Sequence, residues 1–381
     1  MNSTATPSTA RLARLALLID QDPGNPLLLA DASQEAMAAG DYESAERYLQ
    51  AGLRCDGANA AWRFRLASLK IAQRQLAEAK GLLSVLQAEN PANPSIAHNL
   101  AYIELLASNY SVAAALLDPW IHGQVPSGPD TAAIQSLWLR AMHHADCLDE
   151  AWAWVEVRMR RGELSPSAAG VASLIALDRS ALDDADRLSS SALHNDSSNV
   201  EALVVRGSLC MAKGDTAPAA EALRKAIEKA PHQARAWSTL GFVALLEMNP
   251  AQARTHLEKS LSLSPGDPGT LQALGWACVL LEDLDAAARA FEEAVKEAPD
   301  WGEAQGGLAV VQALRGHSTE AGARAQEARR LHRGSVSARY AEAILSGSPK
   351  GLKGIQRLAN QILRNIGARQ PGAAARKDAD G

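Results

Sequence analysis

Aromatic residues are scarce in this chain and make up only 4% of its 381 residues. Hydrophobic residues make up 47%, so the interior has to be filled by small aliphatic side chains, mainly Ala and Leu. Such side chains favour helices that approach one another closely, whereas sheets favour rings and β-branched residues. The shortage of rings therefore predicts a helical fold.

Cysteine is also rare, and none of the four cysteines forms a CxxC pair. This argues against a zinc site or a disulfide framework. Cys210 and Cys278 lie 68 residues apart, which is twice the repeat length described below. They are interpreted as small core residues in equivalent positions.

The chain has no excess of basic charge and no long apolar run. Lys and Arg total 38 against 43 Asp and Glu, a formal net charge of −5, which gives no general attraction to nucleic acid or anionic membranes. No apolar run approaches the ~20 residues of a membrane-spanning helix. The segment from Arg11 to Asp20 is too short and too charged for a signal peptide. A cytoplasmic protein is therefore expected.

What the sequence does have is a regular spacing of small residues. Alanine recurs at intervals of 34 residues, with one interval of 38, at Ala45, Ala79, Ala113, Ala151, Ala185, Ala219, Ala253, Ala287 and Ala321. The same interval separates Gly207, Gly241 and Gly275, and also Pro231, Pro265 and Pro299. A fixed period of this size is typical of stacked repeats. We therefore predict an all-α, right-handed α-solenoid of tandem helix-turn-helix repeats.

The alanine ladder also predicts how the helices of one repeat pack. A second set of small residues precedes it in every repeat except the one with Ala151, where Leu139 stands instead; these residues are Ser33, Ala67, Ala101, Ser173, Gly207, Gly241, Gly275 and Ala309. Small residues at both positions let two helix backbones approach closely, and a larger side chain would cost ~1–3 kcal/mol in overpacking. Each repeat is too small to fold alone, so neighbouring repeats have to share one core.

At these positions the chain resembles the tetratricopeptide repeat family, whose pattern is Trp-x-x-Leu-Gly-x-x-Tyr, then Ala-x-x-x-Phe, then Pro. Trp237 to Gly241 match its opening, Ala253 to Leu257 its middle and Pro265 its end, although Ala244 replaces the Tyr. Leu274-Gly275, Ala287 to Phe291 and Pro299 match again. Pentatricopeptide repeats, which bind RNA, are the nearby alternative, but their period is slightly longer.

The spacing and the positions of Gly and Pro predict the following organisation. A disordered N-terminus covers 1–8, and a half-repeat with three repeats covers 9–117. An inserted loop covers 118–131, and two divergent repeats with a possible hinge cover 132–199. Four regular repeats cover 200–335, capping helices cover 336–367, and a disordered tail covers 368–381.

The residue after each small position is expected to point into the concave groove that the first helices line. The predicted partner-binding residues are Tyr102, Arg140, Leu174, Phe242, Leu245, Trp276, Val279 and Val310. The C-terminal members are apolar, and an exposed apolar strip is typical of a site for a peptide or an amphipathic helix. Equally, Phe242 and Trp276 can be wedged between successive helices as part of the core.

No pattern in the chain predicts catalysis, a metal or a cofactor. There is no Gly-rich phosphate loop, no nucleophile elbow and no histidine cluster with ligand spacing. Resemblance to the family implies a non-catalytic scaffold, adaptor or assembly chaperone that binds a partner peptide or helix. Two alternatives stay open: nucleic-acid or anionic-surface binding by the basic C-terminal end, and a role as regulatory subunit of a separate enzyme.

Overall fold

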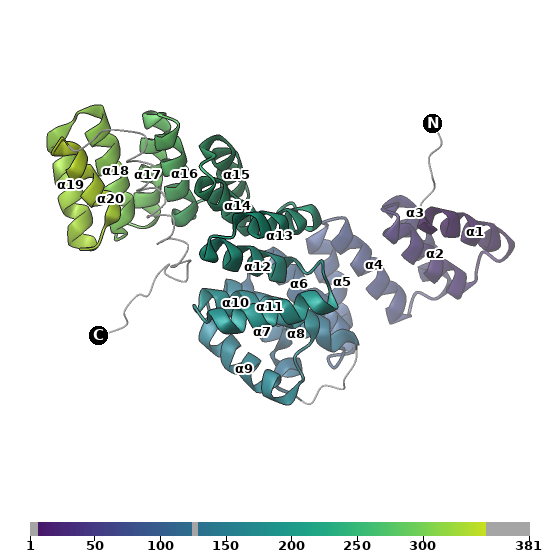
Figure 1. Cartoon of the computed structure of the whole chain (residues 1–381). Helices are drawn as coiled ribbons and strands as arrows, with labels where there is room; N and C mark the ends of the chain where they lie inside the picture. The colour runs from purple at the N-terminus through teal and green to yellow at the C-terminus, as the bar shows by residue number, and fades with distance from the viewer. Residues whose placement is uncertain (1–6, 124–128, 348–381) are drawn as a thin grey trace, which may run out of the picture. The chain divides into compact units, whose positions relative to one another are not determined.

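The computed structural model describes residues 7–123 and 129–347, and these residues form helices and no strand. They divide into two compact units, unit 1 up to Cys147 and unit 2 from Leu148 (Figure 1). Unit 1 holds α1 (Pro7–Gln21), α2 (Pro26–Ala38), α3 (Tyr42–Cys55), α4 (Ala60–Ala72), α5 (Leu76–Glu89), α6 (Pro94–Leu106), α7 (Tyr110–His122) and α8 (Pro129–His144).

Unit 2 contains the remaining helices. These are α9 (Leu148–Arg161), α10 (Pro166–Asp178), α11 (Leu182–Asn195), α12 (Val200–Lys213), α13 (Thr216–Lys229), α14 (Ala234–Leu246), α15 (Pro250–Leu263), α16 (Pro268–Leu280), α17 (Leu284–Glu297), α18 (Gly302–Arg315), α19 (Ser318–Leu331) and α20 (Val336–Leu345). The two helices of the predicted repeat at 132–163, α8 and α9, fall in different units. Whether this junction is a hinge stays a prediction.

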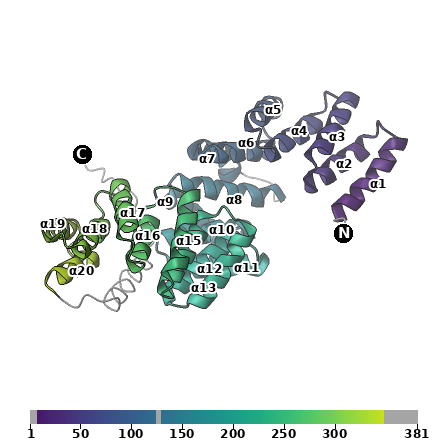
Figure 2. The ribbon, with the colours of Figure 1, turned by 90° about the horizontal axis from the view of Figure 1, so that it is seen from above.

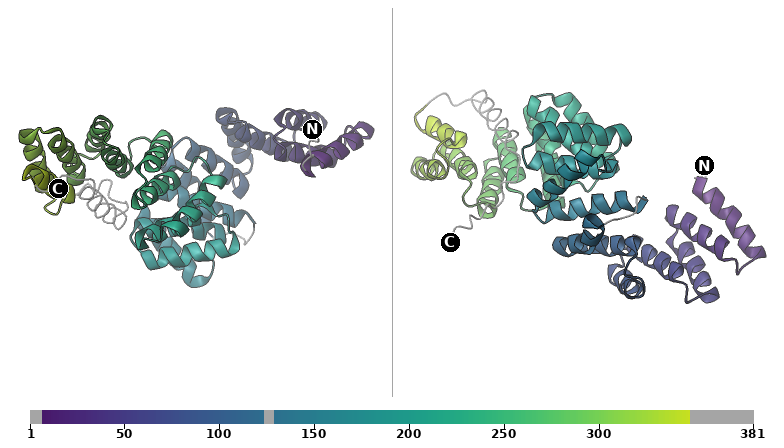
Figure 3. Two further views of the ribbon diagram at one scale, coloured as in Figure 1. Left: turned by 45° about the horizontal axis from the view of Figure 1, so that its top comes forward. Right: turned by 90° about the horizontal axis from the view of Figure 1, so that it is seen from below.

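Within each unit, consecutive helices pack as antiparallel pairs. In unit 1, α2 packs against α3, α4 against α5 and α6 against α7, as Figure 2 shows for α2 and α3. In unit 2 the pairs run from α10 and α11 to α18 and α19, and Figure 3 draws these helices in colours that run from teal to yellow along the chain. First helices of neighbouring pairs also pack together, such as α10 with α12 and α18 with α20. The predicted all-α solenoid of tandem helix-turn-helix repeats is thereby confirmed.

A column of capping residues explains why the first helices begin where they do. Side-chain oxygens accept hydrogen bonds from backbone N–H groups of the first turn, and the residues that carry them keep the interval of 34, or a multiple of it, except across the four extra residues between Asn93 and Asn199. They are Asn25, Asn59, Asn93, Asn199, Asp267 and Ser335. These bonds satisfy donors that the helix itself cannot satisfy, which fixes the start of each helix. The column keeps the period of the alanine ladder.

The ladder alanines lie at the tightest points of the core. All nine are 0% exposed. The glycines facing them are held closer to large side chains: a Cβ on Gly241 would lie 2.6 Å from Leu257, and one on Gly275 would lie 2.5 Å from Phe291. Each glycine therefore packs against the side chain one turn after the ladder alanine. The sequence had suggested contact with the alanine alone.

The turn inside each pair uses the left-handed backbone region. Six of these turns place a residue other than glycine at φ near +60°: Arg74, Ser108, Asp146, Ser180, Met248 and Glu282. The other three use Gly40, Gly214 and Gly316. The spacing is again 34 with one interval of 38, so the turn conformation repeats with the ladder. Side chains with a Cβ are strained in this region.

Glycine at such a turn is expected to stabilise the protein. Glu282→Gly removes the Cβ clash at φ 62°, and we expect the free energy of unfolding to rise by about 0.5–1 kcal/mol. The matched control is Glu247→Gly, because Glu247 ends α14 at φ −77°, where glycine relieves no strain. Urea denaturation of both variants checks this, and an equal gain in the two would contradict the explanation.

Two boundaries differ from the prediction. Helix α7 continues through Pro119 to His122, although a loop was expected from residue 118. Ile121 is 2% exposed, and the indole Nε1 of Trp138 donates a 2.8 Å hydrogen bond to Asp118. These tertiary contacts hold the last turn helical despite the proline. At the N-terminus, α1 begins at Pro7 and so includes two residues of the expected disordered segment. The part of the predicted capping helices beyond residue 347, and the predicted disordered tail, lie outside the described residues.

Candidate functional site

Burial divides the predicted partner-binding row into two parts. All of its members in unit 2 are buried: Leu174 is 8% exposed, Phe242 3%, Leu245 0%, Trp276 0%, Val279 1% and Val310 0%. They do not form the exposed apolar strip that one interpretation of the sequence predicted. The structure places them in the core, which was the other interpretation.

The reason is the close packing of successive first helices in unit 2. Phe242 and Leu245 of α14 belong to one core cluster with Ala273 and Ala277 of α16. Trp276 of α16 belongs to another cluster with Leu308 and Val310 of α18, and its ring also meets the ring of Phe291 of α17 edge-on, with centroids 5.7 Å apart. A side chain placed after the close-packed glycine therefore enters the interface between neighbouring helices instead of facing solvent.

In unit 1 the predicted residues Tyr102 and Arg140 are accessible, and so are the residues that follow the small positions Ser33 and Ala67 in the same way. Gln34 on α2 is exposed, and Ser68 on α4, Tyr102 on α6 and Arg140 on α8 are half-buried. We call these four residues the unit 1 row. Helix α6 packs against both α4 and α8, which places Tyr102 between its neighbours in the row. The accessible part of the predicted site thus lies in unit 1 alone.

The unit 1 row combines an aromatic face with hydrogen-bonding groups. Within the described part of the chain, the Tyr102 hydroxyl makes no hydrogen bond. One turn before it, half-buried His98 contacts the amide of Asn99, with Nδ1 and Oδ1 3.3 Å apart. Ser68 donates to the carbonyl of half-buried Phe64 at 3.0 Å. An aromatic residue with a free hydroxyl group, beside polar side chains, suits contact with a peptide segment.

Sequence reasoning missed an ion pair that crosses the first helices of unit 2. Arg235, at the start of α14, donates two hydrogen bonds to the Asp178 carboxylate at the end of α10, at 2.8 and 2.5 Å. The side chain of Asp178 is 6% exposed and that of Arg235 is 21% exposed. The pair spans the intervening repeat, which contains α12. Residues 57 apart do not share a periodic signal, so the spacing alone did not reveal it.

His256 makes the stability of unit 2 depend on pH. Its half-buried ring packs against Trp237 with centroids 5.5 Å apart, and neither ring nitrogen finds a hydrogen-bond partner in the described residues. Burial, with a smaller contribution from the charge of Arg224, lowers the pKa of His256 below its ordinary 6.5. The folded state therefore binds fewer protons than the unfolded state, and stability is lost as the pH falls below about 6.5.

We accordingly expect the melting temperature of His256→Phe to fall less between pH 7.5 and pH 5.5 than that of the wild type. His232→Phe serves as the control, because His232 is an exposed histidine just before α14. Thermal denaturation at the two pH values checks the prediction. If the melting temperatures of the wild type and of His256→Phe fall equally between the two pH values, His256 is not the cause of the pH dependence of stability.

The described residues contain no group of three or more His, Cys, Asp or Glu side chains arranged to hold a metal ion. Cys55, Cys147, Cys210 and Cys278 form no disulfide among the described residues. Of the helices in the described ranges, none combines the length and the apolar character that a membrane crossing requires.

Comparison with known families decides what kind of repeat this is. Three models, each described as tetratricopeptide repeat, match residues 36–102, residues 232–296, and residues 172–234 with 273–336. The chain belongs to the tetratricopeptide repeat family. As a tetratricopeptide repeat protein it is, in the general sense of the family, a protein-interaction scaffold, and such scaffolds are generally non-catalytic. No curated protein matches its sequence.

One solved structure supports the fold over most of the chain. Human IFIT1, as a dimer with m7Gppp-AAAA, superposes with a TM-score of 0.53 at 14% identity, over 94% of this chain and 96% of its own. YrrB, a tetratricopeptide repeat protein with an unusual peptide-binding site, gives a TM-score of 0.39 at 19% identity, over 49% of this chain and 96% of its own. MamA gives 0.36 at 22% identity, over 42% of this chain and 86% of its own.

Proposed function

We propose that this tetratricopeptide repeat protein is a scaffold or assembly adaptor that holds a segment of a partner protein on the unit 1 row, with Tyr102 as the anchor. The observation that carries the proposal is the difference in burial between the two units. The row is buried from Leu174 to Val310 in unit 2, whereas Gln34, Ser68, Tyr102 and Arg140 keep accessible surface in unit 1. A binding site requires side chains that a partner can reach.

The composition of the row favours a peptide segment over a purely apolar helix. Gln34 and Arg140 offer side-chain donors, and Tyr102 offers a ring with a hydroxyl group. Tyr is enriched among the residues that dominate binding energies, because it buries a large area with few rotatable bonds. An extended segment presents backbone donors and acceptors that match such a surface.

A photocrosslinking experiment tests the proposal. p-Benzoylphenylalanine placed at Tyr102 is expected to trap a partner in native cells, whereas the same group at Tyr42 is not. Tyr42 is 37% exposed, belongs to the same unit and lies on a second helix, so it is a matched control.

The trapped partner then allows a quantitative measurement. Tyr102→Ala is expected to raise the dissociation constant of the complex with the trapped partner by at least about tenfold, as for a central anchor residue. Tyr42→Ala should leave the constant within about twofold. If Tyr102→Ala stays folded and binds the trapped partner as tightly as the wild type does, the unit 1 row is not the binding site.

A further inference from the structure

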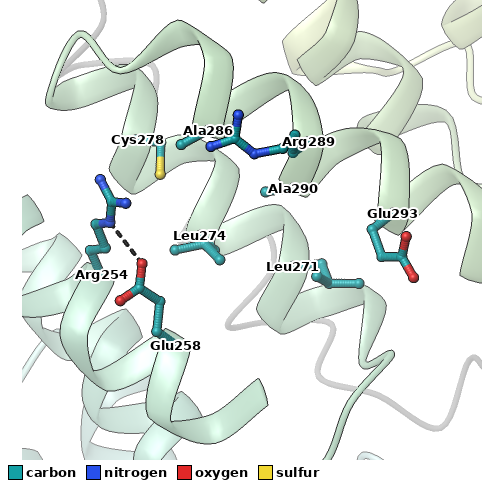
Figure 4. A pocket seen from close by; sticks show the side chains of 9 residues that line it. All are labelled: Arg254, Glu258, Leu271, Leu274, Cys278, Ala286, Arg289, Ala290 and Glu293. Carbon is teal, nitrogen blue, oxygen red and sulfur yellow. Dashed lines mark hydrogen bonds and ion pairs between the residues drawn. The ribbon is translucent and has the colours of Figure 1, made fainter. Parts of the chain in front are cut away.

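A second candidate binding site lies in unit 2, between the second helices α15 and α17. A cavity of about 260 Å³ opens there above α16 (Figure 4). Leu271, Leu274 and Cys278 of α16 line it from below, and Ala290 of α17 lines one side. Burial raises the pKa of the Cys278 thiol, so this lining carries no charge at neutral pH.

Comparison with the neighbouring repeats shows why the space is open. One repeat earlier, Trp237 and His256 occupy the positions of Leu271 and Ala290, and their rings pack with centroids 5.5 Å apart. One repeat later, Gln305 and Arg324 occupy them and form a 3.3 Å hydrogen bond. The same site is thus filled by an aromatic pair on one side and by a polar pair on the other.

A third repeat supports the comparison. Leu203 and Ala222 stand at the same two positions there, so that repeat has the same two residue types. In it, however, Arg206 replaces Leu274 and extends to Asp186, to which it donates a hydrogen bond of 2.6 Å. The repeat from 268 to 301 has only aliphatic side chains at all three positions, with no ring, amide or guanidinium among them, and the cavity lies beside these side chains.

The charges around the opening leave one cation available. Arg254 is held by Glu258 at 2.8 Å and by Asp283 at 3.0 Å. Glu293 is held by Lys296 at 3.1 Å. Arg289 is exposed and makes no hydrogen bond or ion pair with any part of the chain that the structure describes. The opening therefore has an apolar floor and, at its edge, a guanidinium that no carboxylate of the described residues holds by a hydrogen bond.

We propose that this cavity receives an aromatic side chain of a partner protein, next to an acidic residue that pairs with Arg289. The protein itself shows in the preceding repeat that a ring fits this place. The guanidinium attracts both a carboxylate and the face of a ring. A cavity this small and open buries too little of a free ligand to hold it tightly, so it suits an anchor residue carried by a larger partner surface.

This site is separate from the unit 1 row, and its test does not depend on that proposal. The probes are the blocked dipeptides N-acetyl-Asp-Trp-amide, N-acetyl-Lys-Trp-amide and N-acetyl-Asp-Ala-amide. Methyl NMR spectra of the full chain follow the methyl groups of Leu271, Leu274 and Ala290. We expect saturable shifts of these methyl groups with Asp-Trp, binding about threefold weaker with Lys-Trp, and no shift with Asp-Ala.

Two variants make the test decisive. Leu271→Trp/Ala290→His installs the aromatic pair of the preceding repeat, so it should fold normally and abolish binding of Asp-Trp. Arg289→Gln alters only an exposed side chain and should remove the preference for Asp-Trp over Lys-Trp. Binding that survives in the filled variant overturns the proposal. Equal binding of Asp-Ala and Asp-Trp also overturns it, and so does an unchanged preference for Asp-Trp over Lys-Trp in Arg289→Gln. These two outcomes decide the test even if the filled variant does not fold.

Discussion

Trp276→Ala is expected to lower the free energy of unfolding by about 3–5 kcal/mol, and Phe242→Ala by a similar amount. Both rings are almost completely buried, at 0% and 3% exposed, and each is surrounded by core residues of two neighbouring helices. Truncation removes their buried area and leaves a cavity that the close-packed glycines beside them cannot fill. Urea denaturation measures the loss.

The comparison that distinguishes core from binding site is Tyr102→Ala. This residue occupies the equivalent position in unit 1, but it is half-buried, so its truncation should cost about 1–2 kcal/mol. If Trp276→Ala and Phe242→Ala instead leave the stability unchanged, their burial does not contribute to the core, and the unit 2 part of the row has to be considered again as a binding surface.

The second large effect is expected at the ion pair between Asp178 and Arg235. Arg235→Ala leaves a nearly buried carboxylate without its bidentate partner, which should cost about 3 kcal/mol. The same substitution in an Asp178→Ala background should lower the free energy of unfolding much less, because the carboxylate that Arg235 contacts is then absent. The difference between the two costs is the coupling energy of the pair.

A conservative variant separates charge from geometry. Arg235→Lys keeps the positive charge but offers no planar pair of donors, so we expect it to recover only part of the stability. If Arg235→Ala costs the same in both backgrounds, the two side chains do not stabilise the protein through each other, and the contact between α10 and α14 has another basis.

The periodic residues made the fold readable from the sequence. The spacing of Ala219, Ala253 and Ala287 predicted the helix pairs, and each of these alanines is fully buried. The turn conformation was harder to predict, because residue types such as Arg74, Met248 and Glu282 do not indicate a left-handed backbone, whereas glycine does. Only the period links them to Gly40, Gly214 and Gly316.

The candidate site was much less predictable, for a physical reason. Whether Trp276 faces solvent depends on the distance between its helix and the first helix of the next repeat, and one repeat's sequence does not specify that distance. The ion pair of Asp178 and Arg235 and the cavity beside Leu271 likewise depend on neighbouring repeats. Contacts within a repeat are determined by the sequence of that repeat, whereas contacts between repeats depend on how neighbouring repeats pack together.

The shared register of caps, turns and small residues has a consequence for how this protein can change in length. Removing residues 234–267 as a block would join the end of one repeat to the start of an equivalent one, and every column would stay in phase. Removing 33 residues instead would leave one extra residue at the new junction, so the columns before and after it would be out of phase by one. Evolution can therefore shorten or extend this region in whole repeats by duplication and loss, while smaller changes in length are confined to the junctions, such as the four extra residues between Ala113 and Ala151.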